Sequence, residues 1–205
     1  MTQALEATAP LAIDDATADR LFRTARTVTT FAESEVTDEQ LTAVYDLIKW
    51  GPTMMNTSPL RMLVVRTPEA RQRLVGHMPE NNKERVAKAP VTLVLAYDTD
   101  FHERLDVLIP HNPGAREMFA GDAAMRAGAA RTSALLQAGY LLVGLRAAGL
   151  AVGPMNGDYA GIDAEFFAEN GWKGFLVVNV SAADGADTTR PRAPRLSFDD
   201  AAQVV

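Results

Sequence analysis

Residues 122–148 have the sequence DAAMRAGAARTSALLQAGYLLVGLRAA, which is the longest helical pattern in the chain. Gly149, directly after the stretch, is a typical C′ residue that would end the helix. At 1.5 Å per residue this helix would be about 40 Å long, more than the width of a small domain. Its many alanine and glycine residues allow other elements to pack closely on more than one side. We therefore expect a central packing helix that also contributes to a contact between subunits.

The segments around this helix predict a mixture of strands and helices. Residues 91–97, VTLVLAY, are apolar at nearly every position and predict a strand buried on both faces. Thr37 and Gln40 predict a capping box at the start of a helix that Gly51 and Pro52 end. The other expected elements are that helix over 38–50, a strand over 60–66, a helical stretch over 68–77, a short strand over 150–153, a turn over 154–157, a helix near 163–169 and a strand over 174–181. Because these do not alternate as in a regular βαβ series, we predict an α+β sheet with helices packed around it.

The chain of 205 residues has the size of one domain. Residues 1–20 have few large apolar groups and predict a loose N-terminal arm or a short surface helix, while the main domain is expected over 21–182. Residues 101–120 predict an inserted loop with short helical turns that would serve as a lid. Residues 183–205 form a C-terminal tail without an apolar run of core size, so this tail is expected to lie on a partner subunit. The polar stretch 79–89 shows no clear pattern.

Composition argues against several classes of protein. The net charge is −6 and the isoelectric point about 5.1, which argues against nucleic acid as a partner. The chain has no cysteine, so it forms no disulfide and no thiolate metal site, as suits a reducing cytoplasm. No apolar run reaches the roughly 18 residues that a membrane helix needs. The N-terminus lacks a basic start and predicts no signal peptide, so we expect a cytoplasmic protein without membrane contact.

The common catalytic motifs are absent from the sequence. It has no dinucleotide-binding G-x-G-x-x-G, no phosphate-binding P-loop and no G-x-S-x-G nucleophile elbow. Its three histidines, His77, His102 and His111, lack helical metal-ligand spacing, so no metal site is expected. Asp98 and Asp100 predict a polar turn after a strand rather than cation ligands. An enzyme with this sequence would therefore rely on a bound cofactor.

Three segments together resemble a known family. They are ARTVTTF at 25–31, GPTMMNTSP at 51–59 and GLAVGPMNG at 149–157. In order and spacing they resemble the FMN-dependent nitroreductase family, and the resemblance covers most of the chain. Within that family the chain looks most similar to the malonic semialdehyde reductases of pyrimidine utilisation, through DLIKWGPT at 46–53 and RAPRLSF at 192–198.

The resemblance implies a nitroreductase-like sheet surrounded by helices, with FMN bound noncovalently. Arg26 would bind the FMN phosphate as a charged donor, and Thr27 would donate its hydroxyl. Arg195 in the tail would add a second cation, with Arg192 as a helper. The phosphate end of the site would thus combine residues from both ends of the chain.

The resemblance also implies contacts to the flavin ring. Asn82 and Arg85 would lie near its pyrimidine edge, where a cation stabilises the charge of the reduced ring. The 154–157 turn would offer a backbone N–H to flavin N5, which carries the chemistry, so no catalytic side chain is assigned. Asn56 and its neighbours in 52–59 would hold the ring or the substrate across a dimer. The implied FMN contacts are Arg26, Thr27, Pro52, Thr53, Met54, Asn56, Asn82, Arg85, Pro154, Met155, Asn156, Gly157, Arg192 and Arg195.

The chain departs from the family pattern at several of these positions. Ala25 and Thr29 stand where the family has basic residues, so phosphate binding would depend on fewer charges. Met54 and Met55 replace small polar residues beside the flavin, and Asn156 stands where some relatives have glutamate. The substrate of the broad family therefore cannot be transferred to this chain.

The implied activity is that of a homodimeric oxidoreductase with ping-pong kinetics. NADPH or NADH would reduce FMN, and the hydride would then pass to a small carbonyl substrate, namely malonic semialdehyde, giving 3-hydroxypropionate. His111 and Arg116 in the lid would anchor the substrate carboxylate; alternatively, Arg116 simply pairs with a surface acid. Alternative functions are a broad nitro- or quinone reductase, a flavin-binding protein without turnover, and a dimerisation domain that has lost flavin.

Overall fold

The apolar run 91–97 forms β2 (Val91–Tyr97), a central strand of a four-stranded sheet, as predicted. The computed structural model describes residues 11–33, 35–188 and 191–205. The sheet has the order β1-β2-β4-β3, and every neighbouring pair of strands is antiparallel. Its other strands are β1 (Leu60–Val65), β3 (Leu150–Met155) and β4 (Lys173–Ala182). β1 and β3 are the two edges, and the predicted α+β class is confirmed.

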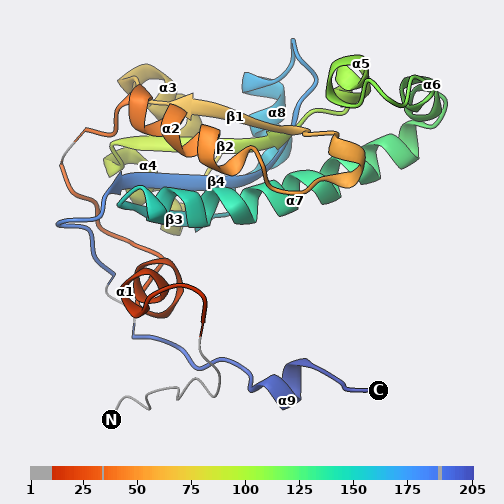
Figure 1. The fold of residues 1–205 in the computed structure, drawn as a ribbon. Helices are drawn as coiled ribbons and strands as arrows, with labels where there is room; N and C mark the ends of the chain where they lie inside the picture. Colours follow the sequence, from red (N-terminus) through yellow and green to blue (C-terminus); the bar gives the residue numbers. More distant parts are fainter. Residues whose placement is uncertain (1–10, 34, 189–190) are drawn as a thin grey trace.

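Helices cover both faces of this sheet (Figure 1). Leu93 and Leu95 of β2 face α2 and α7, whereas Val94 and Ala96 face α3, α4 and α8. This alternation follows from the two-residue period of a strand and explains why β2 carries apolar side chains on both faces. The helices are α2 (Asp38–Ile48), α3 (Pro68–Gly76), α4 (Glu80–Lys88), α7 (Ala123–Ala147) and α8 (Tyr159–Phe166).

The long helix α7 joins two hydrophobic cores. Its C-terminal part packs against the sheet through Leu141 and Leu145, while its N-terminal part buries Ala129 and Ala130 against the 101–120 segment. That segment forms the short helices predicted for it and lies beyond the end of the sheet, beside the start of α7 (Figure 1). Its elements are η3 (Phe101–Arg104), α5 (Leu105–Leu108) and α6 (Ala115–Ala120).

The predicted start of α2 and the predicted end of α7 are confirmed, whereas α2 ends at Ile48, two residues before the expected position 50. The Asp122 side chain accepts from the backbone N–H of Met125 at 2.9 Å, and Gly149 after the last turn has φ +77°. Thr37 and Gln40 form the reciprocal capping box of α2. Local capping chemistry thus fixes where both helices begin and where α7 ends.

Three sequence-based assignments were wrong in detail. The stretch 79–89 contains α4, which the sequence pattern misses because Pro79 provides no side-chain cap and the helix buries little beyond Asn82 and Val86. α8 begins at Tyr159, four residues earlier than expected, because Asp158 caps it. The first half of the predicted 154–157 turn belongs to a strand, since β3 continues through Pro154 to Met155. A proline is tolerated there because β3 is an edge strand.

The helices α1 and α9, near the two ends of the described chain, lie at one side of the molecule, away from most of the sheet (Figure 1). The N-terminal segment forms α1 (Asp15–Ala18) and a π-helical turn, η1 (Asp19–Arg23); residues 1–10 of the predicted arm lie outside the described residues. The tail carries α9 (Phe198–Ala201), and its residues from 191 onward are exposed. The described part of the tail therefore adds nothing to the core of its own chain.

The close approach of α2 and α7 depends on Gly144. A Cβ built on Gly144 would overlap the Ile48 side chain of α2, so we expect Gly144→Ala to lower the free energy of unfolding by about 1–3 kcal/mol. Gly128, on the same helix, has open space around it. Gly128→Ala should therefore be neutral or stabilise by up to about 1 kcal/mol through helix propensity alone. Denaturant unfolding of both variants measures the difference, and equal effects would contradict this packing constraint.

Candidate functional site

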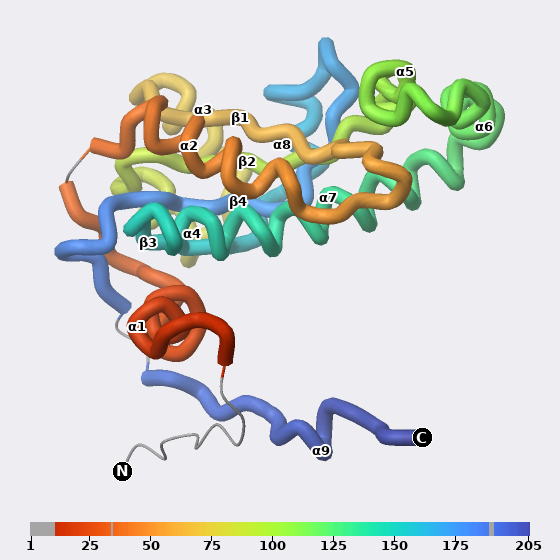
Figure 2. Tube along the Cα trace, viewed as in Figure 1, coloured from red at the N-terminus to blue at the C-terminus, as the bar shows by residue number. Residues whose placement is uncertain are grey.

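The edge of β3 carries the first of the predicted site segments. Thr27 forms a parallel bridge with Val152, and the Val28 N–H donates to the Val152 carbonyl at 3.1 Å. Gly153 permits this approach, because a Cβ there would lie only 2.9 Å from the Val28 carbonyl oxygen. Figure 2 shows the N-terminal segment running down to this end of the molecule beside the chain that follows β4. Residues 26–28 are therefore aligned with the strand that leads to 154–157.

The segment after β4 holds residues 26–30 from the other side. The backbone N–H groups of Thr29 and Thr30 donate to the Asp187 carbonyl at 2.8 and 3.2 Å, and Thr30 and Asp187 form an antiparallel bridge. The segment 183–188 and β3 thus both border the Arg26 segment, which fixes its path over several residues.

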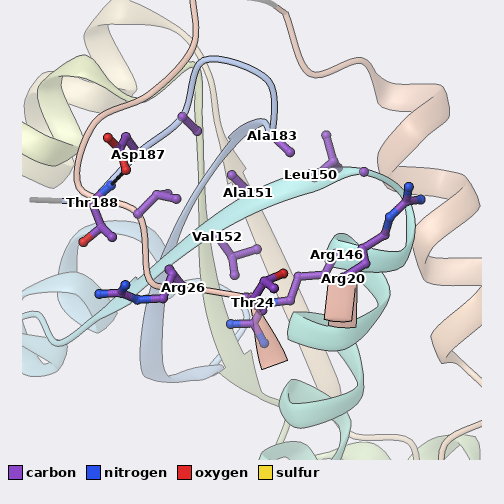
Figure 3. A pocket seen from close by; sticks show the side chains of 14 residues that line it. Arg20, Thr24, Arg26, Arg146, Leu150, Ala151, Val152, Ala183, Asp187 and Thr188 are labelled. Carbon is purple, nitrogen blue, oxygen red and sulfur yellow. Dashed lines mark hydrogen bonds between the residues drawn. The ribbon is translucent and has the colours of Figure 1, made fainter. Parts of the chain in front are cut away.

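A pocket of about 380 Å³ lies beside this segment (Figure 3). β3 crosses it, and arginine and threonine side chains lie around the strand (Figure 3). The lining residues are Arg20, Thr24, Ala25, Arg26, Val28, Arg146, Gly149, Leu150, Ala151, Val152, Ala183, Ala186, Asp187 and Thr188. Three arginines from three separate segments therefore meet at one concave surface, and Asp187 is the one acidic residue in the lining formed by the part of the chain that the structure describes.

The positive charge at this pocket is concentrated. Burial lowers the pKa of the half-buried Arg146 guanidinium, and the nearby charge of Arg192 lowers it further. Arg146 donates to the Leu21 carbonyl at 3.2 Å and Arg192 to the Ala25 carbonyl at 3.0 Å, so both cations are held close to the pocket. An anion bound between such cations would relieve their mutual repulsion. The residues present therefore suit a phosphate group.

The far end of β3 brings together a second group of predicted residues. The Asn82 side chain donates from Nδ2 to the Asn156 carbonyl at 3.4 Å, and Asn82 itself is buried. Arg85 lies three residues further along α4, so it faces the same side of that helix. Tyr159 donates its hydroxyl to the Asn156 side-chain oxygen at 3.4 Å, and burial raises the pKa of Tyr159. Asn82, Asn156 and Tyr159 thus form one polar group at the edge of the sheet, and Arg85 lies one helical turn from Asn82 on α4.

The 52–59 turn lies at the opposite edge of the sheet, before β1. Buried polar groups of α7 hold it: Ser133 accepts from the Met54 N–H at 3.2 Å, and Gln137 accepts from the Leu60 N–H at 3.0 Å. Met55, Asn56 and Ser58 all have positive φ (47°, 53° and 45°), a concentration of backbone strain that is typical of functional segments. Three strand spacings separate β1 from β3, about 14 Å. One chain therefore does not bring Met54 and Asn56 to Asn156.

The 101–120 segment lies on the same side as this turn. The Asn56 side chain donates to the Leu108 carbonyl at 2.9 Å, which ties the turn to α5. His111 and Arg116 are both exposed, and Arg116 lies 3.5 Å from Asp106 in an ion pair within the segment. The turn and the 101–120 segment therefore form one unit, away from the Arg26 pocket of the same chain.

Arg195 is not brought to the pocket in this chain. It is exposed and donates to the carbonyls of Ala193 and Pro194 next to it in sequence, both at 3.1 Å. Arg192, by contrast, reaches the Ala25 backbone. Of the two tail arginines predicted for the phosphate, one lies at the Arg26 segment of its own chain and the other does not.

Sequence reasoning missed Arg20, Arg146 and Tyr159 as neighbours of the site. Arg146 is in the last turn of α7, where a basic residue is usually explained by the helix dipole, so its position alone does not mark it. Tyr159 follows the recognised GPMNG segment by two residues, and that proximity was the one clue available.

Over 11–33, 35–188 and 191–205, no group of three or more histidine and acidic side chains has the geometry to hold a metal ion. In the same part of the chain, no helix combines the length and the apolar character needed to span a membrane.

Comparisons with known proteins agree with this fold and these segments. A Streptomyces coelicolor protein named "Putative NADH dehydrogenase/NAD(P)H nitroreductase" is 48% identical over 196 residues, which cover 95% of this chain and 99% of that protein. A Leptothrix cholodnii protein of the same name is 43% identical over 195 residues, 95% and 98% of the two chains.

A solved structure shows the same fold. The Exiguobacterium sibiricum protein described as a "putative nitroreductase in complex with FMN" superposes with a TM-score of 0.80 at 18% identity, over 97% of this chain and 100% of that one. The model of the nitroreductase family matches residues 22–168. Since that match spans most of the chain and the relatives align over nearly their full length, this chain belongs to the nitroreductase family.

Proposed function

We propose that this chain is an FMN-dependent NAD(P)H oxidoreductase that reduces malonic semialdehyde to 3-hydroxypropionate. The observation that carries the proposal is the alignment along β3, which connects the arginine-lined pocket at Arg26 with the polar group at Asn156. FMN supplies hydride transfer at N5 when bound. The FMN complex of the E. sibiricum protein and the NAD(P)H in the names of the S. coelicolor and L. cholodnii proteins support this cofactor and this donor.

The phosphate of FMN would lie at the Arg26 end of β3. Arg26 and Thr27 supply a cation and a hydroxyl there, and Arg192 and Arg146 add charge from the tail and from α7. Asn156 lies four positions after Val152, which corresponds to about 13 Å along an extended chain. That length suits an extended ribityl phosphate with the flavin ring at its far end.

The backbone of β3 suggests which N–H group faces flavin N5. Because the Val152 carbonyl points outward to Val28, the backbone groups of every second residue after it face the free edge. Pro154 has no N–H to offer, so the next outward donor in this alternation is Asn156. Asn82 and Arg85 would then lie at the pyrimidine edge, where they stabilise the negative charge of the reduced ring.

A homodimer would complete this site. Exposed apolar side chains gather on α2, on the turn after it and on the neighbouring surface of α7, and we call this surface the apolar face. It consists of Leu47, Trp50, Met54, Leu136 and Tyr140. Trp50 is 82% exposed, which is unusual for so large an apolar group and is typical of an interface. Since 52–59 lies about 14 Å from β3 in its own chain, a second copy would supply Pro52, Thr53, Met54 and Asn56.

The 101–120 segment would accompany this turn onto the partner's flavin. It would act as a lid in which Arg116, with His111, anchors the carboxylate of the aldehyde acid. Asp106 holds Arg116 in the absence of substrate, and the carboxylate of malonic semialdehyde would replace it. Hydride would add to the aldehyde carbon and a proton to its oxygen. Both substrates would use the same flavin face in turn, so we expect ping-pong kinetics.

Broad reduction of nitro compounds or quinones is the second candidate. Two observations favour it: the names of the relatives include NAD(P)H nitroreductase, and Arg116 already has a carboxylate partner in Asp106. In that case the lid would carry no specific anion site.

Loss of the Arg26 guanidinium should weaken FMN binding. Because a charge-assisted hydrogen bond contributes about 1.5–3 kcal/mol, we expect Arg26→Ala to raise the Kd for FMN about ten- to a hundredfold, as measured by flavin fluorescence titration. Lys88→Ala removes an exposed cation of α4 that pairs with Glu84 and serves as the control. Equal FMN affinity in wild type and Arg26→Ala would contradict the phosphate assignment.

A charge on the apolar face should separate the subunits and release the flavin. We expect Tyr140→Asp to convert a dimer into a monomer with low FMN content, because a carboxylate would be buried without a partner. Tyr140→Phe keeps the ring and should remain a flavin-loaded dimer. Light scattering and the flavin absorbance of each preparation measure both properties. A wild-type monomer that carries FMN would refute the two-copy site.

The proposed reaction is tested by supplying acceptors to the reduced protein without air. NADPH or NADH should bleach the flavin, and malonic semialdehyde should restore its colour with one equivalent of 3-hydroxypropionate formed. Arg116→Ala should raise KM for this acid about tenfold or more and leave the KM for an uncharged quinone unchanged.

Asp106→Asn separates the two explanations for Arg116. This variant breaks the same ion pair but keeps the guanidinium, so KM for the acid should not rise. Turnover of nitroaromatics and quinones with no reaction of the aldehyde acid would favour the second candidate. A similar loss with both acceptors in Arg116→Ala would mean that the lid serves only stability.

A further inference from the structure

Tyr159 is held firmly beside the Asn156 end of β3. It is the first residue of α8, whose start is fixed by the Asp158 side chain accepting from the Gly161 N–H. The ring is partly buried in the core beneath α8 and passes over Gly174 of β4, where a Cβ would lie 3.3 Å from the ring carbon Cδ1. The absence of a side chain at Gly174 therefore makes room for the ring.

The Tyr159 hydroxyl bonds to two consecutive residues of the site. It donates to the side-chain oxygen of Asn156 at 3.4 Å, and the backbone N–H of Gly157 faces the phenol oxygen. From the other side, Asn82 donates to the backbone carbonyl of Asn156 at 3.4 Å. Residue 156 is thus held by α8 through its side chain and by α4 through its backbone.

These contacts set the orientation of the Asn156 side-chain amide. An asparagine side chain has one oxygen that accepts and one NH₂ group that donates. Because the Gly157 N–H faces the phenol oxygen, the hydroxyl donates to Oδ1 of Asn156, and Nδ2 is left as the donor group of this amide. Replacing the hydroxyl by hydrogen would remove the group that distinguishes this orientation from its 180° flip.

We propose that Tyr159 is a positioning residue that presents the Asn156 amide as a hydrogen-bond donor to the flavin, and thereby raises the reduction potential of the bound cofactor. This inference rests on the proposed function, because it needs the flavin ring at Asn156. Reduction adds electrons to the ring, so donors that face its N5 and carbonyl side stabilise the reduced form more than the oxidised form. An amide locked as a donor adds to that effect, whereas a freely flipping amide would present its oxygen part of the time.

The test compares how tightly the apoprotein binds oxidised and reduced FMN. We expect Tyr159→Phe to weaken reduced FMN about tenfold relative to oxidised FMN, which equals a fall of about 30 mV in the two-electron potential. Thermal unfolding of the apoprotein should change little, because the ring and its packing remain. Tyr45→Phe, which removes an exposed hydroxyl on α2 at the other face of the sheet, is the control and should leave the ratio unchanged.

Asn156→Ala distinguishes a positioning role from a direct one. We expect it to lower the potential at least as much as Tyr159→Phe, and Tyr159→Phe should add nothing in the Asn156→Ala background. Additive shifts would mean that the hydroxyl acts on the flavin itself, which overturns the inference. A shift in Asn156→Ala alone would overturn it as well and leave the proposed site intact. If neither variant changes the potential of bound FMN, the ring does not lie at Asn156 and the proposed site fails too.

Discussion

The hydrogen bond from the Val28 N–H to the Val152 carbonyl determines the geometry of the whole site. It joins segments 124 positions apart in the sequence and lays residues 26–28 along the free edge of β3. Gly153 makes the approach possible, because any Cβ would press on the Val28 carbonyl. The same bond sets the alternation of the strand, so that Pro154, which has no N–H, faces the free edge. A cofactor with a phosphate at one end and a ring at the other fits such a straight edge.

α7 imposes the second constraint, because it is longer than the sheet it supports. Its buried Ser133 and Gln137 hold the 52–59 turn at the β1 edge, while Arg146 in its last turn reaches the pocket beside β3. Thirteen residues separate Ser133 from Arg146, about 20 Å of helix. A rigid helix of that length keeps the two halves of the site apart in one chain. In the proposed dimer the same rigidity sets how far the partner's turn and lid extend over the flavin.

Much of the fold could be predicted from the sequence because its signals are local. The apolar run of β2, the capping box at Thr37 and the C′ glycine at Gly149 each depend on a few neighbouring residues, and all three hold in the structure. α4 could not be predicted, because its stability comes from packing rather than from an apolar stripe. The site was found as three segments by resemblance. The contacts of Arg146 and Tyr159 depend on which elements meet in space, and no local pattern encodes that.

The arginines around the pocket bear on the two positions where this chain lacks the basic residues of the family pattern. Ala25 and Thr29 remove two basic positions from the N-terminal segment, which suggested a weak phosphate site. The structure places Arg146 at the same pocket, where burial and the Arg192 charge lower its pKa. Because an arginine guanidinium stays charged in proteins, the repulsion between Arg146 and Arg192 is an unfavourable energy in the free protein. A bound phosphate would remove part of that repulsion, so cations lost from one segment and regained from a helix end and the tail can support the same ligand.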